Sequence, residues 1–549
     1  MRQPHGILVS SPFHFNPTCV TGGAKFQAAL EEWSAMRTLL SSSIKSYLDA
    51  CTALTAIYAQ APDWSSQESA VDLGLKTVDL ELDSLASEEN ALRDVRTSLA
   101  TIRNKSVTLV RVNTLPPEIL AQIFVLSKAY CIRSGSIYFN NIASVCAYWQ
   151  RVAFNTPDLW THIDVGPRTP VNLAEVLLRR AKDKPLHIHL CEPELERTPD
   201  IDISKTISVI TPHIHRVCSM DMQSYNQSRA FICTLLNLWL AHGSTTLSKS
   251  LSIYRPKGER LLYSYGVTSK HRQLKCQSEN ANGVLSSLST LHLDRVKFDW
   301  GNCAYRDLID LRIDLPSPNP SISMPQLITI LTANPALSTL KLGRLKITSP
   351  EDWVPPAPVE LNHLKVLNLI HLQPGSLRLL LPVISLPSAS GELSVGLSLS
   401  GGSQDELQNF LARSQMAMLY CLCSELSTLQ RTLVSLPCLD TLILDHLEIS
   451  EEPATEENVV ASQPMQHSHI SSVVLLSSVV SFTGLERFVT EHGVQTLSLE
   501  KCSAHKESNH DLQAMRASLL ELFPKLGCSI SDTDSTYRQP CRTIFDYLS

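Results

Sequence analysis

Histidine and cysteine are common metal ligands, and the sequence has four places where two histidines or two cysteines are separated by one residue. On a β-strand, residues i and i+2 face the same side, so each pair could offer two ligands to one ion. A zinc site needs three or four ligands, and no pair is followed by a second pair at zinc-finger spacing. We therefore expect solvated or packed side chains here and no metal centre. The pairs are His187 and His189, His213 and His215, His467 and His469, and Cys421 and Cys423.

The sequence lacks the short motifs that position catalytic groups or phosphates. It has no P-loop, dinucleotide-binding glycine motif, H-E-x-x-H zinc motif or G-x-S-x-G nucleophile elbow. The nearest glycine-rich stretch, SGGSQDE at 400–406, is typical of a turn from a strand to a helix. We predict a non-catalytic protein without a cofactor. An enzyme hidden in the C-terminal region is the alternative, and it would need a deep pocket of converging His, Cys or carboxylate groups.

Length and composition indicate a folded protein of several units or one elongated array. The chain has 549 residues, of which 43% are hydrophobic and 18% charged. A net charge of −6 does not suggest a nucleic-acid partner, and no apolar run is long enough to cross a membrane. The 15 cysteines are scattered, which favours reduced thiols, and no signal-peptide core is present. We expect a soluble protein of the cytoplasm, the nucleus or both.

Residues 1–24 are predicted to be a flexible N-terminus, and residues 25–110 to form two helical stretches. In the second stretch one series of apolar residues recurs every seven positions, while the alternate seam position is apolar only near its end. The first series is Val71, Val78, Leu85, Leu92 and Leu99, and the second is Glu81, Glu88, Val95 and Ile102. A seam that is only half apolar favours a helical hairpin or a short coiled coil. The partner helix would come from the same chain or from a second copy, giving a homodimer.

A rigid helix start lies in TLPPEILAQIF at 114–124. Pro116 and Pro117 suit a first helical turn, because the N–H that proline lacks would have no partner there. The apolar residues behind them form a stripe. After a polar spacer a second stripe runs through VCAYWQRVAF at 145–154, and DLWTHIDV at 158–165 predicts a packed tryptophan followed by a strand. A motif this small buries little surface, so its apolar stripe must pack on a neighbour or await a partner.

From Pro185 onward one short pattern occurs eleven times: an apolar residue, then after a short gap apolar–x–apolar. Examples are LSTLHL at 288–293, LSTLKL at 337–342 and LDTLIL at 439–444. The spacing of mostly about 20 to 45 residues is typical of leucine-rich repeats with helical returns. Residues 228–242 and 406–422 are predicted to be such returns. The remaining occurrences lie at 186–190, 217–222, 247–253, 308–313, 364–369, 393–399, 470–475 and 494–499.

Residues 112–165 closely resemble an F-box of the kind common in large fungal families. The resemblance rests on LPPEILAQIF, VCAYWQRVAF and TPDLW. It implies a small helical motif that docks on a Skp-type adaptor of cullin–RING ubiquitin ligases. Helices before this motif and irregular leucine-rich repeats after it are also similar to such fungal proteins. Gln150 departs from the family, whose members often carry an arginine there, and the spacer between the helices is long.

The resemblance also implies roles for individual residues. Residues of the leading Leu-Pro, the stripe behind it and the second helix would face the adaptor, and four others would form the motif's core and its attachment to the next segment. The adaptor-facing set is Leu115, Pro116, Ile119, Leu120, Ile123, Val145 and Trp149. The core set is Phe124, Cys146, Leu159 and Trp160.

We therefore predict an α/β protein with N-terminal helices, a small all-helical F-box at 112–165, a leucine-rich-repeat-like solenoid at 170–525 and a C-terminal tail or cap at 526–549. In such repeats the leucines point into the core and the intervening residues face the concave sheet. The concave candidates for binding a target protein are His292, Asp294, Arg312, Lys341, Asn368, Ile443, Asp445, Ser498 and Glu500.

The expected function is that of a substrate-recognition subunit of an SCF-type ubiquitin ligase, which binds a Skp-type adaptor with its cullin–RING complex and an unidentified target protein. One alternative is a leucine-rich-repeat scaffold whose F-box-like helices only pack internally. A simple connecting helix between the N-terminal helices and the solenoid is the other.

Overall fold

The computed structural model divides the chain into two compact units, residues 1–110 and residues 111–549. Most residues between 22 and 531 are described. The ranges outside the description are 1–21, 61–67, 105–109, 132–141, 166–170, 192–202, 224–228, 255–260, 264–278, 316–320, 352, 355–356, 387–392, 400–403, 424–428, 430–431, 434–435, 437–438, 450–469, 505–511 and 532–549.

The first unit contains two long helices, α1 (Gly22–Gln60) and α2 (Glu68–Asn104). The Tyr47 hydroxyl of α1 donates a hydrogen bond of 2.7 Å to the Glu81 carboxylate of α2. Most of the described apolar side chains on both helices are exposed, by 36–71%. The two predicted helices are therefore present, and their apolar residues are only partly covered within the unit.

The second unit begins with the short helices that the proline-rich stretch predicts. They are η1 (Arg111–Thr114), α3 (Pro117–Cys131), α5 (Ala147–Phe154) and η3 (Pro157–Trp160). The Leu120 N–H donates to the Pro116 carbonyl at 3.1 Å, which is the first bond of α3. The proline pair thus fixes where α3 begins.

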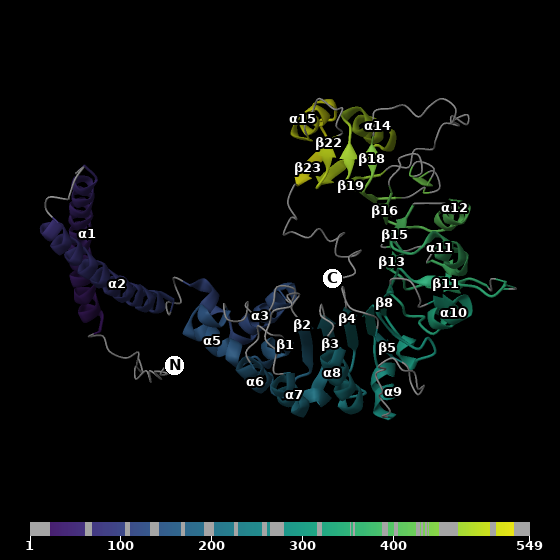
Figure 1. Cartoon of the computed structure of the whole chain (residues 1–549), viewed down its shortest axis with the longest axis horizontal. Coiled ribbons are helices and arrows are strands. Elements are labelled where there is room, and N and C mark those ends of the chain that lie inside the picture. The colour runs from purple at the N-terminus through teal and green to yellow at the C-terminus, as the bar shows by residue number, and fades with distance from the viewer. Residues whose placement is uncertain are drawn as a thin grey trace. The chain divides into compact units, whose positions relative to one another are not determined.

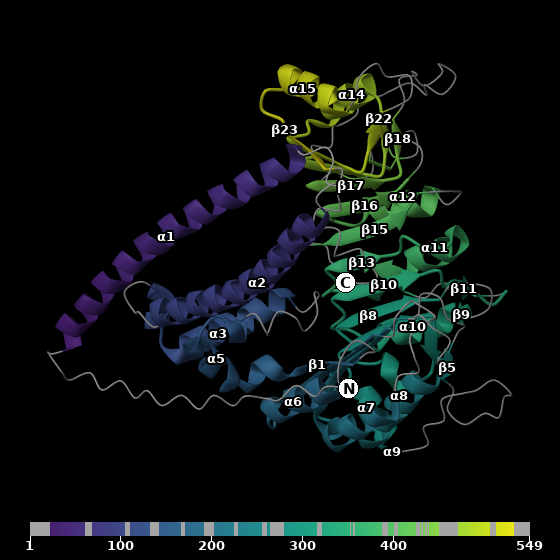
Figure 2. The same cartoon turned by 60° about the vertical axis from the view of Figure 1, so that its left-hand side comes forward.

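A 14-stranded parallel sheet follows these helices and is the largest sheet of the second unit (Figures 1 and 2). Apart from strands of small side sheets, its order in space follows the sequence, so each strand lies beside the next. Its strands are β1 (His162–Val165), β2 (Leu186–Cys191), β3 (Val217–Gln223), β4 (Ser250–Tyr254), β6 (Thr290–Asp294), β8 (Asp310–Asp314), β10 (Thr339–Gly343), β13 (Val366–Asn368), β15 (Ser394–Ser398), β16 (Met418–Leu422), β17 (Thr441–Asp445), β19 (Ser472–Leu476), β21 (Thr496–Glu500) and β23 (Gly527–Ser531).

Helices connect successive strands and lie on one face of this sheet (Figure 1). We call the opposite sheet face the concave face. The connecting helices are α6 (Val171–Ala181), α7 (Ile203–Ile210), η4 (Thr211–Arg216), α8 (Arg229–His242), α9 (Glu279–Ser286), η5 (Cys303–Tyr305), α10 (Met324–Thr332), α11 (Pro374–Leu380), η6 (Leu381–Val383), α12 (Gln404–Ala412), α14 (Phe482–His492) and α15 (Leu512–Leu522).

Short strands form four small parallel sheets beside the large one. They pair β5 (Leu261–Tyr263) with β7 (Val296–Phe298), β9 (Ser321–Ser323) with β11 (Lys346–Thr348), β12 (Val359–Glu360) with β14 (Ile384–Ser385), and β18 (Glu448–Ile449) with β20 (Val479–Val480) and β22 (Ser503–Ala504).

The predicted α/β solenoid is therefore present, and all eleven leucine patterns fall on strands of the large sheet. The solenoid extends beyond the predicted range of 170–525 at both ends. Its sheet starts at β1, which lies within the range 112–165 predicted for the F-box. It ends at β23, which lies within the range 526–549 predicted for a tail or cap and pairs with β21. The predicted return at 228–242 matches α8. The return at 406–422 was wrong in its second half, because only 404–412 is helical and β16 follows. Its five-residue segment MLYCL pairs with β15 and β17 instead of continuing the helix.

The residue directly after five of the strands has a left-handed backbone although none of the five is glycine. Their φ angles lie between 46° and 61°. Four of them donate their backbone N–H to a carbonyl at or near the end of the next strand, at 2.8–3.0 Å. The sharp turn thus satisfies one backbone donor per repeat. The five residues are Arg295, Arg344, His446, Ser477 and Lys501.

Asn334 ties one repeat to the previous one. It is completely buried after α10, where its side-chain N–H groups donate to the carbonyls of Tyr305 (2.8 Å) and Ile330 (2.6 Å). Its side-chain oxygen accepts the Leu308 N–H at 2.6 Å. Three backbone groups that would otherwise be buried without a partner are satisfied by one amide.

We expect Asn334→Ala to lower the free energy of unfolding by about 3 kcal/mol, since it leaves these buried backbone groups unsatisfied. Urea denaturation followed by circular dichroism measures this. Asn362→Ala, at an exposed asparagine that bonds the Glu360 carboxylate, is the matched control and should change stability by less than about 0.5 kcal/mol. Equal effects of the two substitutions would contradict the role of Asn334.

Candidate protein-docking site

The helical motif at the start of the second unit has its own aromatic core. Leu120 and Phe124 of α3 are fully or almost fully buried, and the Phe124 ring packs against Trp149 with centroids 4.9 Å apart. The Trp149 indole N–H donates to the Asn113 side chain at 3.0 Å, and the Tyr148 hydroxyl donates to the Leu115 carbonyl at 2.9 Å. These contacts bind α5 to the segment that leads into α3.

The same motif is fixed to the first repeat of the solenoid through Trp160. Its indole N–H donates to the Ala153 carbonyl at 2.8 Å. The Arg180 guanidinium of α6 lies over two rings, 3.9 Å from the Phe154 centroid and 4.6 Å from that of Trp160. A salt bridge of 3.1 Å joins Lys184 to Asp158. Because Leu159, Trp160 and β1 belong to the same hydrophobic cluster as α6, motif and solenoid share one core.

One face of α3 remains apolar and exposed. Ile119, Ile123 and Leu126 follow one another at i, i+4 and i+7, which places them on the same side of the helix. Leu126 is 69% exposed, and Val145, just before α5, is also exposed. We call these four residues the α3 stripe. Apolar side chains that are both aligned and exposed are a feature of a surface that meets a partner.

The structure separates the predicted adaptor-facing residues into two groups. Pro116, Ile119, Ile123 and Val145 are exposed, whereas Leu115 and Trp149 are half-buried and hydrogen-bonded within the motif. Leu120 is a correction, because its side chain is completely buried in the core and cannot contact a partner.

The predicted core set fits better, and one surface residue was missed. Phe124, Leu159 and Trp160 are buried, while Cys146 is half-buried at the N-cap of α5, where its sulfur accepts the Trp149 N–H at 3.5 Å. Leu126 was not predicted for the surface set. Its i+7 spacing from Ile119 was the available signal.

On the concave face, parallel pairing places one residue from every strand in a single row. The row reads Asp164, His189, Asp221, Ser252, His292, Arg312, Lys341, Asn368, Gly396, Tyr420, Ile443, Val474, Ser498 and Ser529. We call it the concave row. It is polar and titratable from β1 to β13 and apolar from β16 to β19.

Asp310 organises the polar part of the concave face. Arg312 donates two hydrogen bonds to its carboxylate, at 3.0 and 2.8 Å, and His292 Nε2 lies 3.1 Å from it. Burial would raise the pKa of Asp310, but the bonds from His292 and Arg312 lower it to about 2. Burial lowers the pKa of His292, so the imidazole is neutral at pH 7 and Arg312 supplies the positive charge.

Further carboxylates on this face are paired with cations. Arg344 binds Asp314 through two bonds of 2.7 and 2.6 Å and lies 3.7 Å from Asp294. His189 Nδ1 lies 3.1 Å from Asp164, and this hydrogen bond raises the pKa of His189. Burial raises the pKa of Asp221, which lies 3.8 Å from His189 Nε2. The polar part is thus a network of mixed sign.

A hollow of about 230 Å³ opens in this network between β3 and β8. Asp221, Ser252, Tyr254, His292 and Arg312 are among the residues that line it. In this hollow the Ser252 Oγ lies 3.0 Å from His292 Nδ1, and His292 Nε2 lies 3.1 Å from the Asp310 carboxylate, so hydrogen-bonding groups that are linked to one another line it.

The predicted concave residues differ in exposure. His292, Asp294, Arg312, Asp445 and Ser498 keep part of their surface.

Lys341, Asn368, Ile443 and Glu500 are corrections to the expectation of an open face, since all four are buried, Lys341 and Ile443 to 1% exposure. Strand alternation predicts which face a side chain joins, but not what covers it.

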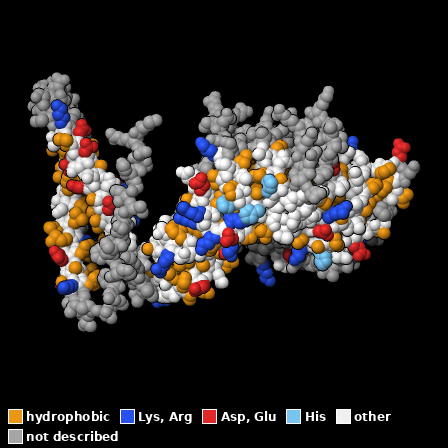
Figure 3. All heavy atoms as spheres, turned by 90° about the horizontal axis from the view of Figure 1, so that it is seen from below, with side chains coloured by type: hydrophobic (Ala, Val, Ile, Leu, Met, Phe, Trp, Pro, Cys, Tyr) orange, Lys and Arg blue, Asp and Glu red, His pale blue; other side chains and the backbone are white. Residues whose placement is uncertain are grey.

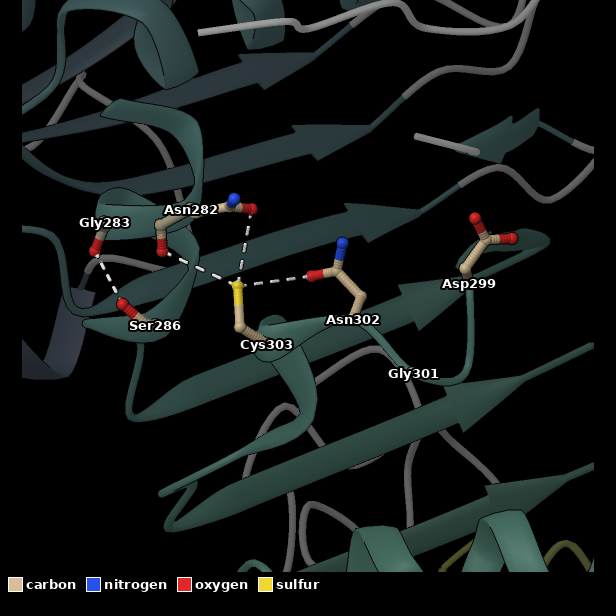
Figure 4. A pocket seen from close by; sticks show the side chains of 7 residues that line it. All are labelled: Asn282, Gly283, Ser286, Asp299, Gly301, Asn302 and Cys303. Carbon is tan, nitrogen blue, oxygen red and sulfur yellow. Dashed lines mark hydrogen bonds between the residues drawn. The ribbon is translucent and has the colours of Figure 1, made fainter. Parts of the chain in front are cut away.

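A second hollow, of about 580 Å³, lies beside α9 and η5 (Figure 4). The Cys303 sulfur points toward Asn282 and Asn302, with the backbone oxygen of Asn282 at 3.6 Å and both side-chain oxygens at 3.7 Å. Burial raises the pKa of the Cys303 thiol, which keeps it protonated and weakly nucleophilic. The geometry offers no general base at the sulfur among the residues drawn.

The pairs singled out for metal binding do not form a site in the part of the chain that is described. No group of three or more His, Cys, Asp or Glu side chains there could hold an ion. Cys421 and Cys423 are both buried, and burial raises the pKa of Cys421 well above its usual value. His467 and His469 lie outside the described residues. Among described helices none is both long and apolar enough to span a membrane.

Residues 112–165 match the model of the F-box-like family, so an F-box-like domain occupies this part of the chain. No curated protein matches the chain in sequence.

Several solved structures match the chain at low identity and low TM-score. The yeast Rad7–Elc1 complex matches at 10% identity and a TM-score of 0.32, covering 83% of this chain and 97% of the other. The leucine-rich repeat-containing protein LegL7 from Legionella pneumophila matches at 13% identity and a TM-score of 0.28. The match covers 70% of this chain and 98% of that protein. The TLR13–ssRNA13 complex matches at 13% identity and a TM-score of 0.33. The match covers 70% of this chain and 55% of the other.

Replacing Asp310 tests the polar network. Because its pKa is depressed in the folded chain, its stabilising contribution is complete above the unfolded value of about 3.9 and is lost as pH falls to about 2. We expect Asp310→Asn to cost roughly 2 kcal/mol at pH 7, with the difference from wild type shrinking between pH 4 and pH 2. Urea denaturation of wild type and variant at pH 7, pH 4 and pH 2 measures this difference in stability. Glu521→Gln, at an exposed carboxylate, is the control. A pH-independent difference would contradict the assignment.

Proposed function

We propose that this chain is the substrate-recognition subunit of an SCF-type cullin–RING ubiquitin ligase. The F-box-like domain at 112–165 docks on a Skp-type adaptor through the α3 stripe. The single observation that carries the proposal is that Ile119, Ile123 and Leu126 stay exposed along one helix face. The core residues of the same domain, Leu120, Phe124, Leu159 and Trp160, are buried. A buried stripe would have favoured purely internal packing.

The solenoid holds the target protein in this proposal. Its concave face presents polar groups over β1–β13, and a protein bound there is kept near the ubiquitin-charged enzyme of the assembled ligase. Tethering raises the local concentration of target lysines and so speeds transfer without chemistry from this chain. The subunit is itself non-catalytic in this reading. Described cysteines that are free agree with a cytoplasmic or nuclear location.

The rigid junction supports the role of a carrier. Trp160 and Arg180 fix the F-box-like domain to the first repeat, so the adaptor and a bound target would keep a constant separation. The same junction also favours the second candidate, a scaffold in which the domain serves only to cap the solenoid. Adaptor binding decides between the two.

A pull-down with purified Skp-type adaptor tests the proposal. We expect full-length wild type to retain the adaptor, and the double variant Ile123→Asp/Leu126→Asp to bind at least about tenfold more weakly, because two charges would be buried at the interface.

The control is Val354→Asp, at an exposed apolar residue of the solenoid, which should bind like wild type. Both variants change exposed residues, so circular dichroism should show unchanged folding. Failure of folded wild type to retain the adaptor would leave the scaffold as the function.

We also propose that α1 and α2 mediate self-association. Figure 3 shows hydrophobic side chains along these helices at the surface, and the seam residues Val78, Leu85, Leu92 and Leu99 remain 36–49% exposed. A two-helix unit cannot enclose its own seam, whereas two such units packed together form a four-helix core. A dimer would present two F-box-like domains in one assembly.

Sedimentation of the full chain tests self-association. We expect a dimer for wild type and a monomer for Leu85→Lys/Leu92→Lys, since two ammonium groups would enter the shared core. Leu80→Lys is the matched control: Leu80 lies on the same helix but is 71% exposed away from the seam, so the variant should remain dimeric. A monomeric wild type would exclude this part of the proposal.

A further inference from the structure

Three linked polar side chains cross neighbouring strands of the concave face. Ser252 lies on β4, His292 on β6 and Asp310 on β8, and parallel pairing places Ser252 directly beside His292. The Ser252 Oγ lies 3.0 Å from His292 Nδ1, and His292 Nε2 lies 3.1 Å from the Asp310 carboxylate. A hydroxyl, an imidazole and a carboxylate in this order are the groups that activate a serine nucleophile.

The proton position on His292 follows from its two neighbours. An ionised carboxylate only accepts hydrogen bonds, so Nε2, next to Asp310, carries the proton of the neutral ring. The lone pair of Nδ1 is then directed at Ser252, whose hydroxyl donates to it. Two hydrogen bonds from Arg312 keep Asp310 ionised, and burial lowers the pKa of His292. The imidazole is therefore neutral at pH 7, which is the state that a general base requires.

The hollow of about 230 Å³ gives a reagent access to this hydroxyl. Ser252 and His292 line it, and both residues keep part of their surface. The hollow is smaller than the roughly 300–1,000 Å³ of ordinary ligand pockets, so it suits a short group. Asp221, Asp294 and Asp314 also line it, and their carboxylates disfavour an anionic group. A short, uncharged group therefore fits best.

The backbone around Ser252 favours a single covalent modification over repeated turnover. Because β4 lies between β3 and β6, its backbone N–H groups bond to the neighbouring strands and do not form an oxyanion hole. Only an ester with a good leaving group would then react. The alkyl ester formed on Ser252 would be hydrolysed slowly, because the serine alkoxide is a poor leaving group.

We propose that Ser252 is a covalent modification site that accepts a short, uncharged acyl group from an activated ester. The Ser252 Oγ forms a bond to the acyl carbon, and the bond between that carbon and the leaving group breaks. The hydroxyl proton passes to His292 Nδ1 and from there to the departing phenolate or thiolate. This site goes beyond the proposed function, in which ubiquitin transfer needs no chemistry from this chain.

Acetylation of the full-length wild type by p-nitrophenyl acetate tests the site. After an acid quench, peptide mass spectrometry follows Ser252 and Ser498 in the same sample. Ser498 is the matched control: it lies in the same concave row and is partly exposed, but its hydroxyl oxygen accepts a hydrogen bond from the Ser529 hydroxyl at 3.1 Å. We expect Ser252 to react at least about tenfold faster, since a positioned general base contributes roughly 10²–10⁴-fold.

Two variants separate the nucleophile from the base. Ser252→Ala should remove the acetylated residue from this peptide. His292→Phe keeps a ring at the position but removes the base, so we expect acetylation of Ser252 to fall at least about tenfold, to the level of Ser498. Circular dichroism establishes that both variants are folded.

The pH dependence gives a readout that needs no variant. The ratio of the Ser252 rate to the Ser498 rate should be constant above pH 6.5 and fall at lower pH, because a protonated His292 cannot accept the serine proton. Asp310 and Arg312 of β8, Asp221 of β3 and Lys341 of β10 are the charged groups that act on this imidazole.

Equal rates at Ser252 and Ser498 in folded wild type, or no acetylation of Ser252, would overturn the proposal. An unchanged Ser252 rate in folded His292→Phe would also overturn it. The adaptor pull-down depends on the α3 stripe and not on these residues, so a failed pull-down would leave the acetylation result standing.

Discussion

Parallel pairing in strict sequence order is the constraint on which the second unit depends. It keeps equivalent residues of all repeats level across fourteen strands, so that one face collects leucines into a core and the other collects the residues between them. The F-box-like helices enter the same core through Trp160 and β1. The α3 stripe, the concave row and the junction at Trp160 are therefore parts of one packed body.

Periodicity made much of this arrangement predictable. Each of the eleven leucine patterns contains an apolar–x–apolar alternation, which is the period of a half-buried strand, and all of them overlap strands of the large sheet. The proline pair before α3 marks a helix start because proline lacks the N–H that a helix interior requires. Both features depend on neighbouring residues in the sequence, so they can be predicted without knowledge of the tertiary structure.

The sequence-based predictions were wrong where tertiary contacts determine the burial or the secondary structure of a residue. Leu120 belongs to the same apolar series as Ile119 and Ile123, yet it is turned into the core by the position of Phe124 and Trp149. The strand β16 was read as helix because its short apolar run satisfies both periods. Lys341 and Ile443 occupy the predicted face, but the burial of a sheet face depends on segments distant in sequence. Strand alternation carries no information about them.

The left-handed residues after five strands have a consequence for how stability is distributed along the solenoid. A side chain in this conformation costs roughly 1 kcal/mol that glycine would not incur. Each of these repeats therefore stores a small conformational penalty in its turn, outside the core and away from the concave row. A glycine at Ser477 is therefore expected to raise the stability of its repeat, whereas a glycine at Arg344 would also remove the pair with Asp314 on the concave face.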